Sequence, residues 1–285
     1  MPRSEDSYAP RKRPVMGQPL FSPSSVFWRV NRELASGLAG PRAVLMQIAH
    51  PLVAAGVAEH SRFRKHRLAR LYRTSMAAAA ITFGSREFAL RAIRSVNQKH
   101  QQVHGVLKTQ EGIFPAGTQY DANDPELKLW VLNTIVDSTL LVYELFVSPL
   151  SDDEREEYYR DSLLVARLFA IPERMTPPTY AEFRSYMSRM LEGNVITAAD
   201  TACEIARALF SPSVEGTLLF LGSAIGIGLL PERLRHEFGF LWNERREFWL
   251  NRTAAASRRV RGHVPSILCS SPVATLSHLR ALMTS

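Results

Sequence analysis

The chain has 285 residues, of which 46% are hydrophobic, and its 35 lysines and arginines against 27 aspartates and glutamates give a net charge of +8. This balance excludes a disordered chain and predicts a globular protein with a sizeable core. Its two cysteines, Cys203 and Cys269, are too few for a disulfide framework or a zinc ribbon, and such usage predicts a cytoplasmic protein.

Positive charge gathers in an N-terminal arm and in residues 245–261. We find no aromatic interleaving typical of nucleic-acid binding, so the latter stretch is interpreted as a solvated basic face and no nucleic-acid partner is expected. The N-terminus lacks a secretory signal, and the longest apolar run, 217–230, is too short to cross a bilayer. No transmembrane segment is predicted, although the arm leaves peripheral contact with an anionic membrane open. Nothing in the sequence sets the oligomeric state.

Helix signals follow one another from Ser25 onward. Residues 1–23 are polar and non-periodic and are predicted to form a flexible basic tail, while 24–285 are predicted to form one all-α domain of many helices. Ser25 precedes an apolar stripe at helical spacing. Gly40-Pro41 then opens a helix predicted over residues 42–59, with the proline in the first turn.

The next two predicted helices are separated by a glycine and a serine. One helix is predicted from about residue 68 to 83, with Gly84 at its end. Ser85 is the expected N-cap of the other helix, which is predicted to reach about Val106. Residues 107–123 are rich in Gly, Pro, Asp and Asn and are predicted to be a loop.

Capping residues mark the predicted starts of helices in the second half of the chain. Asp124-Pro125 opens a mostly apolar helix predicted through Glu144, which we expect to be central. Residues 151–154 and 179–182 have the sequence of capping boxes. Further helices are predicted over 197–209, 217–230 and 232–250 and after Pro272. No convincing strand pattern or internal repeat is present.

Common catalytic signatures are missing. The sequence has no nucleophile elbow, phosphate-binding loop, paired-histidine zinc motif or dinucleotide fingerprint. Gly222, Gly226 and Gly228 lie inside an apolar helical run, so we interpret them as sites of close helix packing and not as a nucleotide loop.

The remaining candidates are polar residues within apolar helices. His100 and His104 are four residues apart, which on one helix places both rings on the same face, where they can bind a metal or can be ordinary histidines near a helix end. Asp137, in the middle of an apolar helix, needs a partner such as Arg70 or a histidine N–H. His50 follows a very apolar stretch, and a structural histidine bonded to a backbone carbonyl is the slightly favoured interpretation.

Together these residues form an ordered set of motifs over residues 37–144. The set resembles the DUF2236 family, which includes the latex-clearing rubber oxygenases and the fungal mpaB-type oxygenases, and weaker likeness extends to about residue 190. The motifs are GLAGPRAVLMQIAHP (37–51), AAGVAEHS (54–61), RLYRT (70–74), ITFG (81–84), HQQVHG (100–105), YDANDP (120–125), WVLNTIVDS (130–138) and YE (143–144).

The resemblance implies an all-helical fold that holds haem b and cleaves carbon–carbon double bonds of isoprenoid chains with dioxygen. It implies that His100 ligates the iron, with His104 as the neighbour to test next, and that Arg70 and Thr74 flank the haem. Arg70 or Arg73 would stabilise negative charge that develops during oxygen activation or anchor a propionate, and Thr74 would act by hydrogen bonding. His50 and Asp137 complete the expected cofactor-binding residues, listed in full as His100, Arg70, Thr74, His104, His50 and Asp137.

Two positions depart from the family pattern. Rubber oxygenases can place a lysine immediately before the threonine, where this chain has Arg73. A guanidinium stays protonated and cannot coordinate iron, so the distal iron site is expected to be open to dioxygen or peroxide. Many relatives have a histidine where this chain has Leu132. Both changes weaken the transfer of rubber as substrate, while a hydrophobic substrate remains expected.

Two other functions fit the same residues. A non-haem metal site built on His100, His104 and Asp137 has the composition of a facial triad. A non-enzymatic helical binding protein would use the polar residues of its core only to fix packing. Absorption of the purified protein separates these alternatives from a haem oxygenase, because only a haem protein shows a Soret band.

Overall fold

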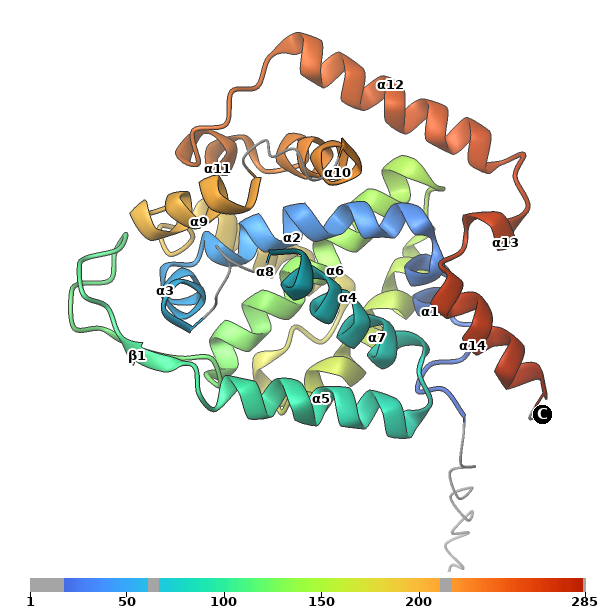
Figure 1. The fold of residues 1–285 in the computed structure, drawn as a ribbon, viewed down its shortest axis with the longest axis horizontal. Helices are drawn as coiled ribbons and strands as arrows, with labels where there is room; N and C mark the ends of the chain where they lie inside the picture. The colour runs from blue at the N-terminus through green and yellow to red at the C-terminus, as the bar shows by residue number, and fades with distance from the viewer. Residues whose placement is uncertain (1–17, 61–66, 211–216, 284–285) are drawn as a thin grey trace, which may run out of the picture.

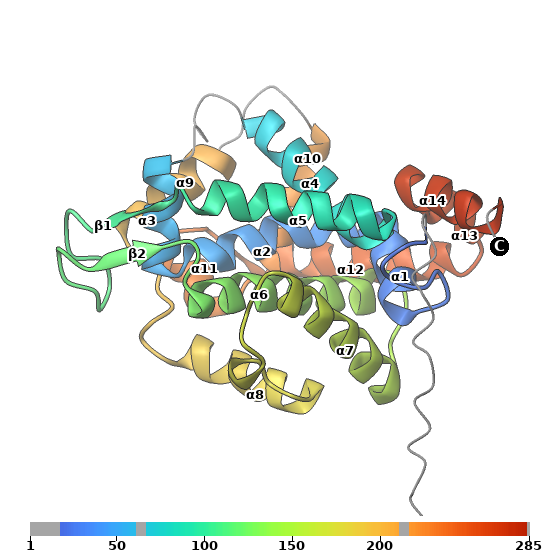
Figure 2. The same cartoon turned by 90° about the horizontal axis from the view of Figure 1, so that it is seen from below.

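The computed structural model describes residues 18–60, 67–210 and 217–283, and these ranges confirm the predicted all-α fold (Figures 1 and 2). The first half contains α1 (Val26–Arg32), η1 (Leu34–Leu38), α2 (Ala39–Ile48), α3 (Pro51–His60), α4 (Arg67–Phe83), α5 (Arg86–His100), β1 (His104–Val106), β2 (Gln119–Asp121) and α6 (Pro125–Phe146). The second contains α7 (Asp152–Leu168), η2 (Glu173–Met175), α8 (Tyr180–Glu192), α9 (Asp200–Phe210), α10 (Thr217–Gly228), α11 (Glu232–Glu237), α12 (Glu244–Arg261), α13 (Ser266–Cys269) and α14 (Pro272–Met283).

The folded part begins before residue 24. Gln18 accepts a hydrogen bond at its carbonyl from the backbone N–H of Arg86 at 2.9 Å, and Pro19 forms a bridge with Ser85. The Phe21 side chain is only 2% exposed and stacks on Phe27. The end of the predicted tail therefore packs against the helices, and residues 1–17 lie outside the described part of the chain.

The helix predicted over residues 42–59 is two helices. α2 ends at Ile48 and α3 begins at Pro51, with His50 between them. Proline has no backbone N–H to continue the ladder of α2, and its ring clashes with the preceding turn, but it fits the first turn of a new helix. The prediction of one helix was wrong because it gave Pro41 this role and ignored Pro51.

The helix predicted to reach Val106 ends at His100. Beyond it the backbone N–H of Val103 donates to the His100 carbonyl at 2.9 Å, and β1 pairs antiparallel with β2, with His104 opposite Asp121. A Cβ at Gly105 would lie 2.6 Å from the Tyr120 hydroxyl, so glycine permits this close approach. The pairing with residues far along the chain overrides the local helical pattern.

Several predicted helix starts are confirmed by their hydrogen bonds. Ser85 accepts from the N–H of Phe88, Asp124 accepts from Glu126, and Ser151 and Glu154 form both halves of a capping box. Thr179 accepts from the N–H of Glu182, which is one half of the predicted box. Short-range capping signals thus located these helices well.

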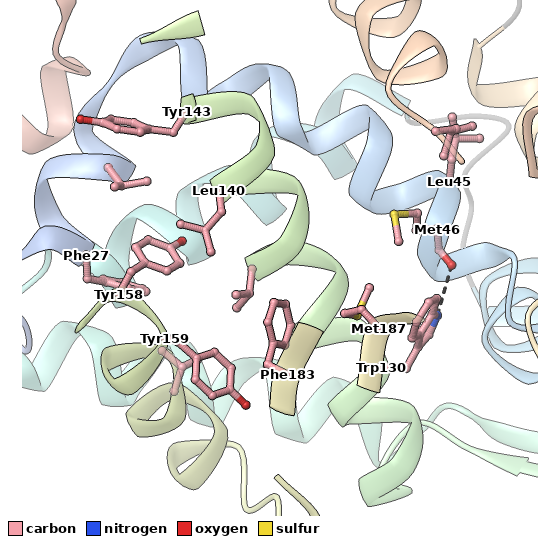
Figure 3. Close-up of a cluster of buried hydrophobic side chains, with 14 of the residues drawn as sticks. Phe27, Leu45, Met46, Trp130, Leu140, Tyr143, Tyr158, Tyr159, Phe183 and Met187 are labelled. Carbon is pink, nitrogen blue, oxygen red and sulfur yellow. Dashed lines mark hydrogen bonds between the residues drawn. The ribbon is translucent and has the colours of Figure 1, made fainter. Parts of the chain in front are cut away.

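The helices form layers around α6. In Figure 2, α4 and α5 lie on one side of α2 and α6, and α7 and α8 lie on the other. The Trp130 indole N–H of α6 donates to the Met46 carbonyl of α2 at 3.1 Å (Figure 3). Tyr158, Tyr159 and Phe183, all nearly inaccessible to solvent, fill the space on the α7–α8 side. This packing joins α2 and α6 at the centre of the core.

Two of the three glycines of α10 are explained by close contacts. A Cβ at Gly226 would lie 2.6 Å from Pro41 Cβ and 2.8 Å from the Arg42 backbone nitrogen, and one at Gly228 would lie 2.3 Å from the Trp242 ring. At Gly222 the nearest atom would be 3.9 Å away. The predicted packing role is therefore confirmed for Gly226 and Gly228.

Helix α6 is also the one described helix whose length and apolar composition would suffice to span a membrane. Its apolar window is 67% buried inside the protein, and its middle carries the buried carboxylate of Asp137. Both properties are those of a core helix.

Candidate functional site

The predicted site residues lie on the hairpin of α4 and α5. The two helices contact each other and are joined by the tight turn at Gly84 and Ser85. Since they leave this turn in the same direction, the start of α4, with Arg70, Arg73 and Thr74, and the end of α5, with His100, lie at the same end of the hairpin (Figure 1). The structure thus brings to one end residues that are about thirty positions apart in the sequence.

His100 lies on the inward face of α5. Ala89 and Ile93 are buried, and Asn97 and His100 continue the same stripe at spacings of four and three residues. The described residues contain five buried side-chain nitrogen or oxygen atoms without a hydrogen-bond partner, and two of them are His100 Nδ1 and Asn97 Oδ1. A buried polar atom normally has a partner, because leaving it without one costs free energy. Two such atoms lie one turn apart at this end of α5, so this end of the helix has hydrogen-bonding capacity that no described residue uses.

The environment of His100 favours its neutral form. Burial lowers the pKa of the imidazole, the positive charge of Lys128 lowers it further, and the carboxylate of Asp121 opposes both. A neutral imidazole is the form that binds a metal ion. Burial and Lys128 therefore favour the protonation state that metal ligation requires.

The side chains near the start of α4 are exposed to solvent. Residues 72–76 are all exposed, including Arg73 and Thr74, and the exposed Tyr72 and Met76 lie one turn apart on the same face. A helix in a folded domain normally buries an apolar stripe. The side chain of Arg70 lies outside the described residues, so its predicted role stays a prediction.

His104 is not on the helical face of His100. It is exposed in β1, and its carbonyl accepts a hydrogen bond from His60 Nε2 at 3.1 Å. Nearby, the Tyr120 hydroxyl donates to Glu59 at 2.6 Å and packs over Gly105. The prediction of two histidine rings on one helical face was wrong, because the helix ends between them. Tyr120 and Glu59 instead fix the strand against α3.

His50 has a hydrogen-bond partner at Nδ1 and an aromatic neighbour for its ring. Its Nδ1 accepts the backbone N–H of Leu52 at 3.3 Å, and its ring stacks on Phe114 with centroids 5.7 Å apart. Burial lowers the pKa of His50 to about 4, so the ring is neutral at pH 7. The partner is a backbone donor and not the carbonyl that the sequence suggested. His50 joins α2 to α3.

Asp137 is bound by two arginines. Arg42 of α2 lies 2.7 Å from Oδ2 and Arg184 of α8 lies 2.5 Å from Oδ1. Arg42 also donates to the Ser138 hydroxyl at 2.7 Å and to the Leu229 carbonyl at 2.8 Å. The sequence had pointed to Arg70 or a histidine as the partner. It missed Arg42, whose signal was an arginine inside an apolar helical stripe.

This arrangement does not support the non-haem triad. Both oxygens of Asp137 are occupied by arginines, and His104 lies in a strand. Among the described residues no group of three His, Cys, Asp or Glu side chains is placed to hold a metal ion. What the site offers is one half-buried imidazole, with its Nδ1 atom buried, and an exposed helix start at the same end of a hairpin.

Comparison with known proteins identifies the family of this chain. The catalytic-domain family described as ER-bound oxygenase mpaB/B′/Rubber oxygenase matches residues 28–259, which is most of the chain. The chain belongs to this family. As a member of the mpaB/rubber oxygenase family it carries an oxygenase catalytic domain, and the matched range includes α4, α5 and α6.

The curated relatives add sequence likeness without a described activity. An uncharacterized protein from Mycobacterium bovis and one from Mycobacterium tuberculosis are each 29% identical over 159 residues, covering 54% of this chain and 60% of their own length. The chain therefore spans less than two thirds of these relatives. No solved structure matches it.

Proposed function

We propose that this oxygenase domain uses haem b, with His100 as the iron ligand and dioxygen or peroxide on the open opposite side. The observation that carries the proposal is the buried, unpartnered Nδ1 of His100. It lies at the same hairpin end as the uncovered residues 72–76. A flat apolar cofactor placed there would lie beside Tyr72 and Met76, leave part of their apolar surface for a substrate, and give the imidazole a partner.

The residues present fit such a group chemically. His100 offers a neutral imidazole, which is a common ligand of haem iron. Arg73 and Thr74 are exposed at the same end, and Arg70 precedes them in α4. The arginines would pair with propionates or stabilise developing negative charge, and Thr74 would donate a hydrogen bond. When bound, haem supplies the activation of oxygen or peroxide, which no amino-acid side chain provides.

We propose a hydrophobic substrate, such as an isoprenoid chain or another small organic molecule. The uncovered apolar surface of Tyr72 and Met76, 66% and 41% exposed, supports this class. Family membership supports an oxygenation reaction. Arg73 lies at the position where rubber oxygenases can have lysine. We therefore propose a hydrophobic substrate in general and not rubber in particular.

Spectroscopy of matched histidine variants tests the proposal. The full chain, expressed with iron and a haem precursor, is expected to show a Soret band and about one haem per chain. His100→Ala is expected to lose most of the haem or shift the band, whereas His104→Ala, a control four residues away and exposed, keeps both. Full haem content with an unshifted spectrum in His100→Ala would remove His100 as ligand.

The same preparation distinguishes the other two candidate functions. A colourless protein with stoichiometric iron would favour a non-haem site. A protein that binds neither iron nor haem would favour a helical binding module. Either outcome contradicts the haem proposal and leaves the fold and family membership unchanged.

A further inference from the structure

Helix α12 is fixed to the protein along one face. Leu250 and Ala254 are buried against a small cluster that includes Val142 and Phe146. The Ser257 hydroxyl donates to the Phe146 carbonyl at 2.8 Å, and Arg261 forms two hydrogen bonds of 2.8 Å with the buried carboxylate of Glu33. In Figure 1, α12 runs along the edge of the molecule opposite α5.

The opposite face of α12 is basic and aromatic. At 3.6 residues per turn, the half of α12 that faces away from Leu250 and Ala254 carries Glu244, Ala255, Ala256 and six exposed cationic or large apolar residues, which are Arg245, Phe248, Trp249, Arg252, Arg259 and Val260. We call these six residues the outer face of α12. Glu247 lies on the inner side, where it accepts from the Trp242 indole at 2.7 Å. Glu244, at the first residue, is the carboxylate nearest to the outer face.

The aromatic residues of the outer face are held in position and not buried. Phe248 and Trp249 are 54% and 57% exposed and meet edge to face at 5.9 Å. The Arg252 guanidinium lies 5.4 Å from the centre of the Phe248 ring. Just before the helix, Leu241 is 83% exposed, and Arg246 donates to its carbonyl. Large apolar groups are thus presented to solvent among three cations.

We propose that the outer face of α12 docks on the surface of an anionic phospholipid membrane. Arginines near a membrane are attracted by anionic headgroups, while Trp and Phe insert at the boundary between headgroups and acyl chains. Leu241 and Val260 extend this apolar contact, which a nucleic acid would leave in water. The sequence interpretation of a solvated basic face missed Phe248 and Trp249. Helical spacing alone did not show which face of α12 packs against the rest of the protein and which face is exposed.

Vesicle binding by the full chain tests this docking. The protein is expected to sediment with phosphatidylcholine vesicles that contain phosphatidylglycerol but not with phosphatidylcholine alone, and added salt should release it. The double variant Arg252→Gln with Arg259→Gln is expected to bind roughly 30-fold more weakly, as the loss of two headgroup attractions predicts. Phe248→Ala with Trp249→Ala should weaken binding by at least roughly tenfold.

A second exposed pair supplies a matched control. Phe88 of α5 is 57% exposed, and Arg91 lies 4.3 Å from its ring centre. In Figure 1, α5 lies at the opposite edge of the molecule from α12. Phe88→Ala with Arg91→Gln should leave vesicle binding unchanged. Thermal unfolding of each variant verifies that it is folded, and since the altered side chains of α12 are exposed, their folding should be intact.

Three results would overturn the docking proposal. The first is equal binding to neutral and anionic vesicles. The second is binding that the α12 variants do not weaken more than the α5 control. The third is no binding to anionic vesicles at low salt, whether or not the α12 variants disrupt a dimer or an oligonucleotide complex. Binding is expected with and without haem, so failure here leaves the proposed oxygenase function untouched.

Discussion

Asp137 and His100 are both polar side chains on the inner faces of helices, but their surroundings differ. Asp137 is 6% exposed, and each of its oxygens pairs with an arginine. His100 has a buried nitrogen with no partner, and the neighbouring Asn97 has an unpartnered oxygen. A polar cluster in which every charged or polar atom has a partner stabilises the fold. A cluster with unpartnered polar atoms, next to an exposed helix start, indicates a place for a ligand. We therefore expect substitution at Asp137 to lower stability and substitution at His100 to affect ligand binding.

The largest loss of stability is expected from Asp137→Ala. It leaves Arg42, which is 5% exposed, as a buried cation without its carboxylate, and removing one partner of a buried pair costs about 3–5 kcal/mol. Urea unfolding followed by circular dichroism measures this loss. Arg184→Gln is the control, because the Arg184 side chain is half exposed and its loss should cost about 1 kcal/mol or less. Equal effects of the two variants would contradict the structural role of the Arg42 pair.

The next effect is a pH dependence caused by His50. Its folded pKa is about 4, below the ordinary value of 6.5, so its stabilising contribution is complete above pH 6.5 and is lost as the pH falls toward 4. The expected loss of unfolding free energy over this range is roughly 2–3 kcal/mol.

His50→Asn is the variant that isolates this pH dependence. Asparagine can accept the Leu52 N–H without titrating, so the curve of unfolding free energy against pH should flatten. The pKa of His100 is lowered as well, so the slope that remains should have the same sign and become smaller in the double variant with His100→Asn. The lowered pKa values of Glu59 and Glu154 add a slope of the same sign near and below pH 4.5. A slope that the single variant leaves unchanged would show that His50 is not the responsible group.

Two glycines of α10 sharpen the comparison further. Gly226→Ala places a Cβ 2.8 Å from the backbone of Arg42, so it should separate α10 from α2 and cost about 1–3 kcal/mol. Gly222→Ala meets nothing closer than 3.9 Å and should stabilise the helix by about 0.5–1 kcal/mol. The melting temperatures of the two variants should move in opposite directions. A decrease of similar size in both would show that the packing of α10 is not as described.

The smallest effects on stability are expected at the start of α4. Arg73→Gln and Thr74→Val alter exposed side chains, so each should change the unfolding free energy by less than about 0.5 kcal/mol. If these residues act on the cofactor, the same variants should lower oxygen consumption or alter the haem spectrum. A variant that changes neither the spectrum nor oxygen consumption would have no role in the site.

Local signals predicted most of the fold, and the break before Pro51 was a local signal that was overlooked. Long-range contacts account for the errors at the end of α5 and at Asp137. The caps at Ser85, Asp124 and Ser151 were found because a cap involves only the next few residues. The end of α5 was missed because β1 pairs with Gln119–Asp121, and no pattern within α5 encodes that pairing. The arginine partners of Asp137 come from α2 and α8, which sequence spacing does not bring together.

The candidate site was predicted only in part. His100 followed from the family resemblance, and the structure adds what spacing could not show, that its Nδ1 is buried and unpartnered. Asn97 was missed, although it continues the stripe of Ala89 and Ile93. His104 was included because four residues correspond to one helical turn, an argument that fails once the helix ends.

Ligand replacement at position 100 tests the central claim most directly. His100→Gly, loaded with haemin and titrated with free imidazole, removes the side chain and then returns its ligating group to the same space. The proposal predicts a Soret band that is absent or shifted in the variant and that moves, as imidazole is added, to the position shown by the wild-type protein at the same imidazole concentration, because free imidazole can also enter the open side in both proteins. A wild-type band in the variant before imidazole is added, or a shifted band that imidazole does not restore, would contradict it.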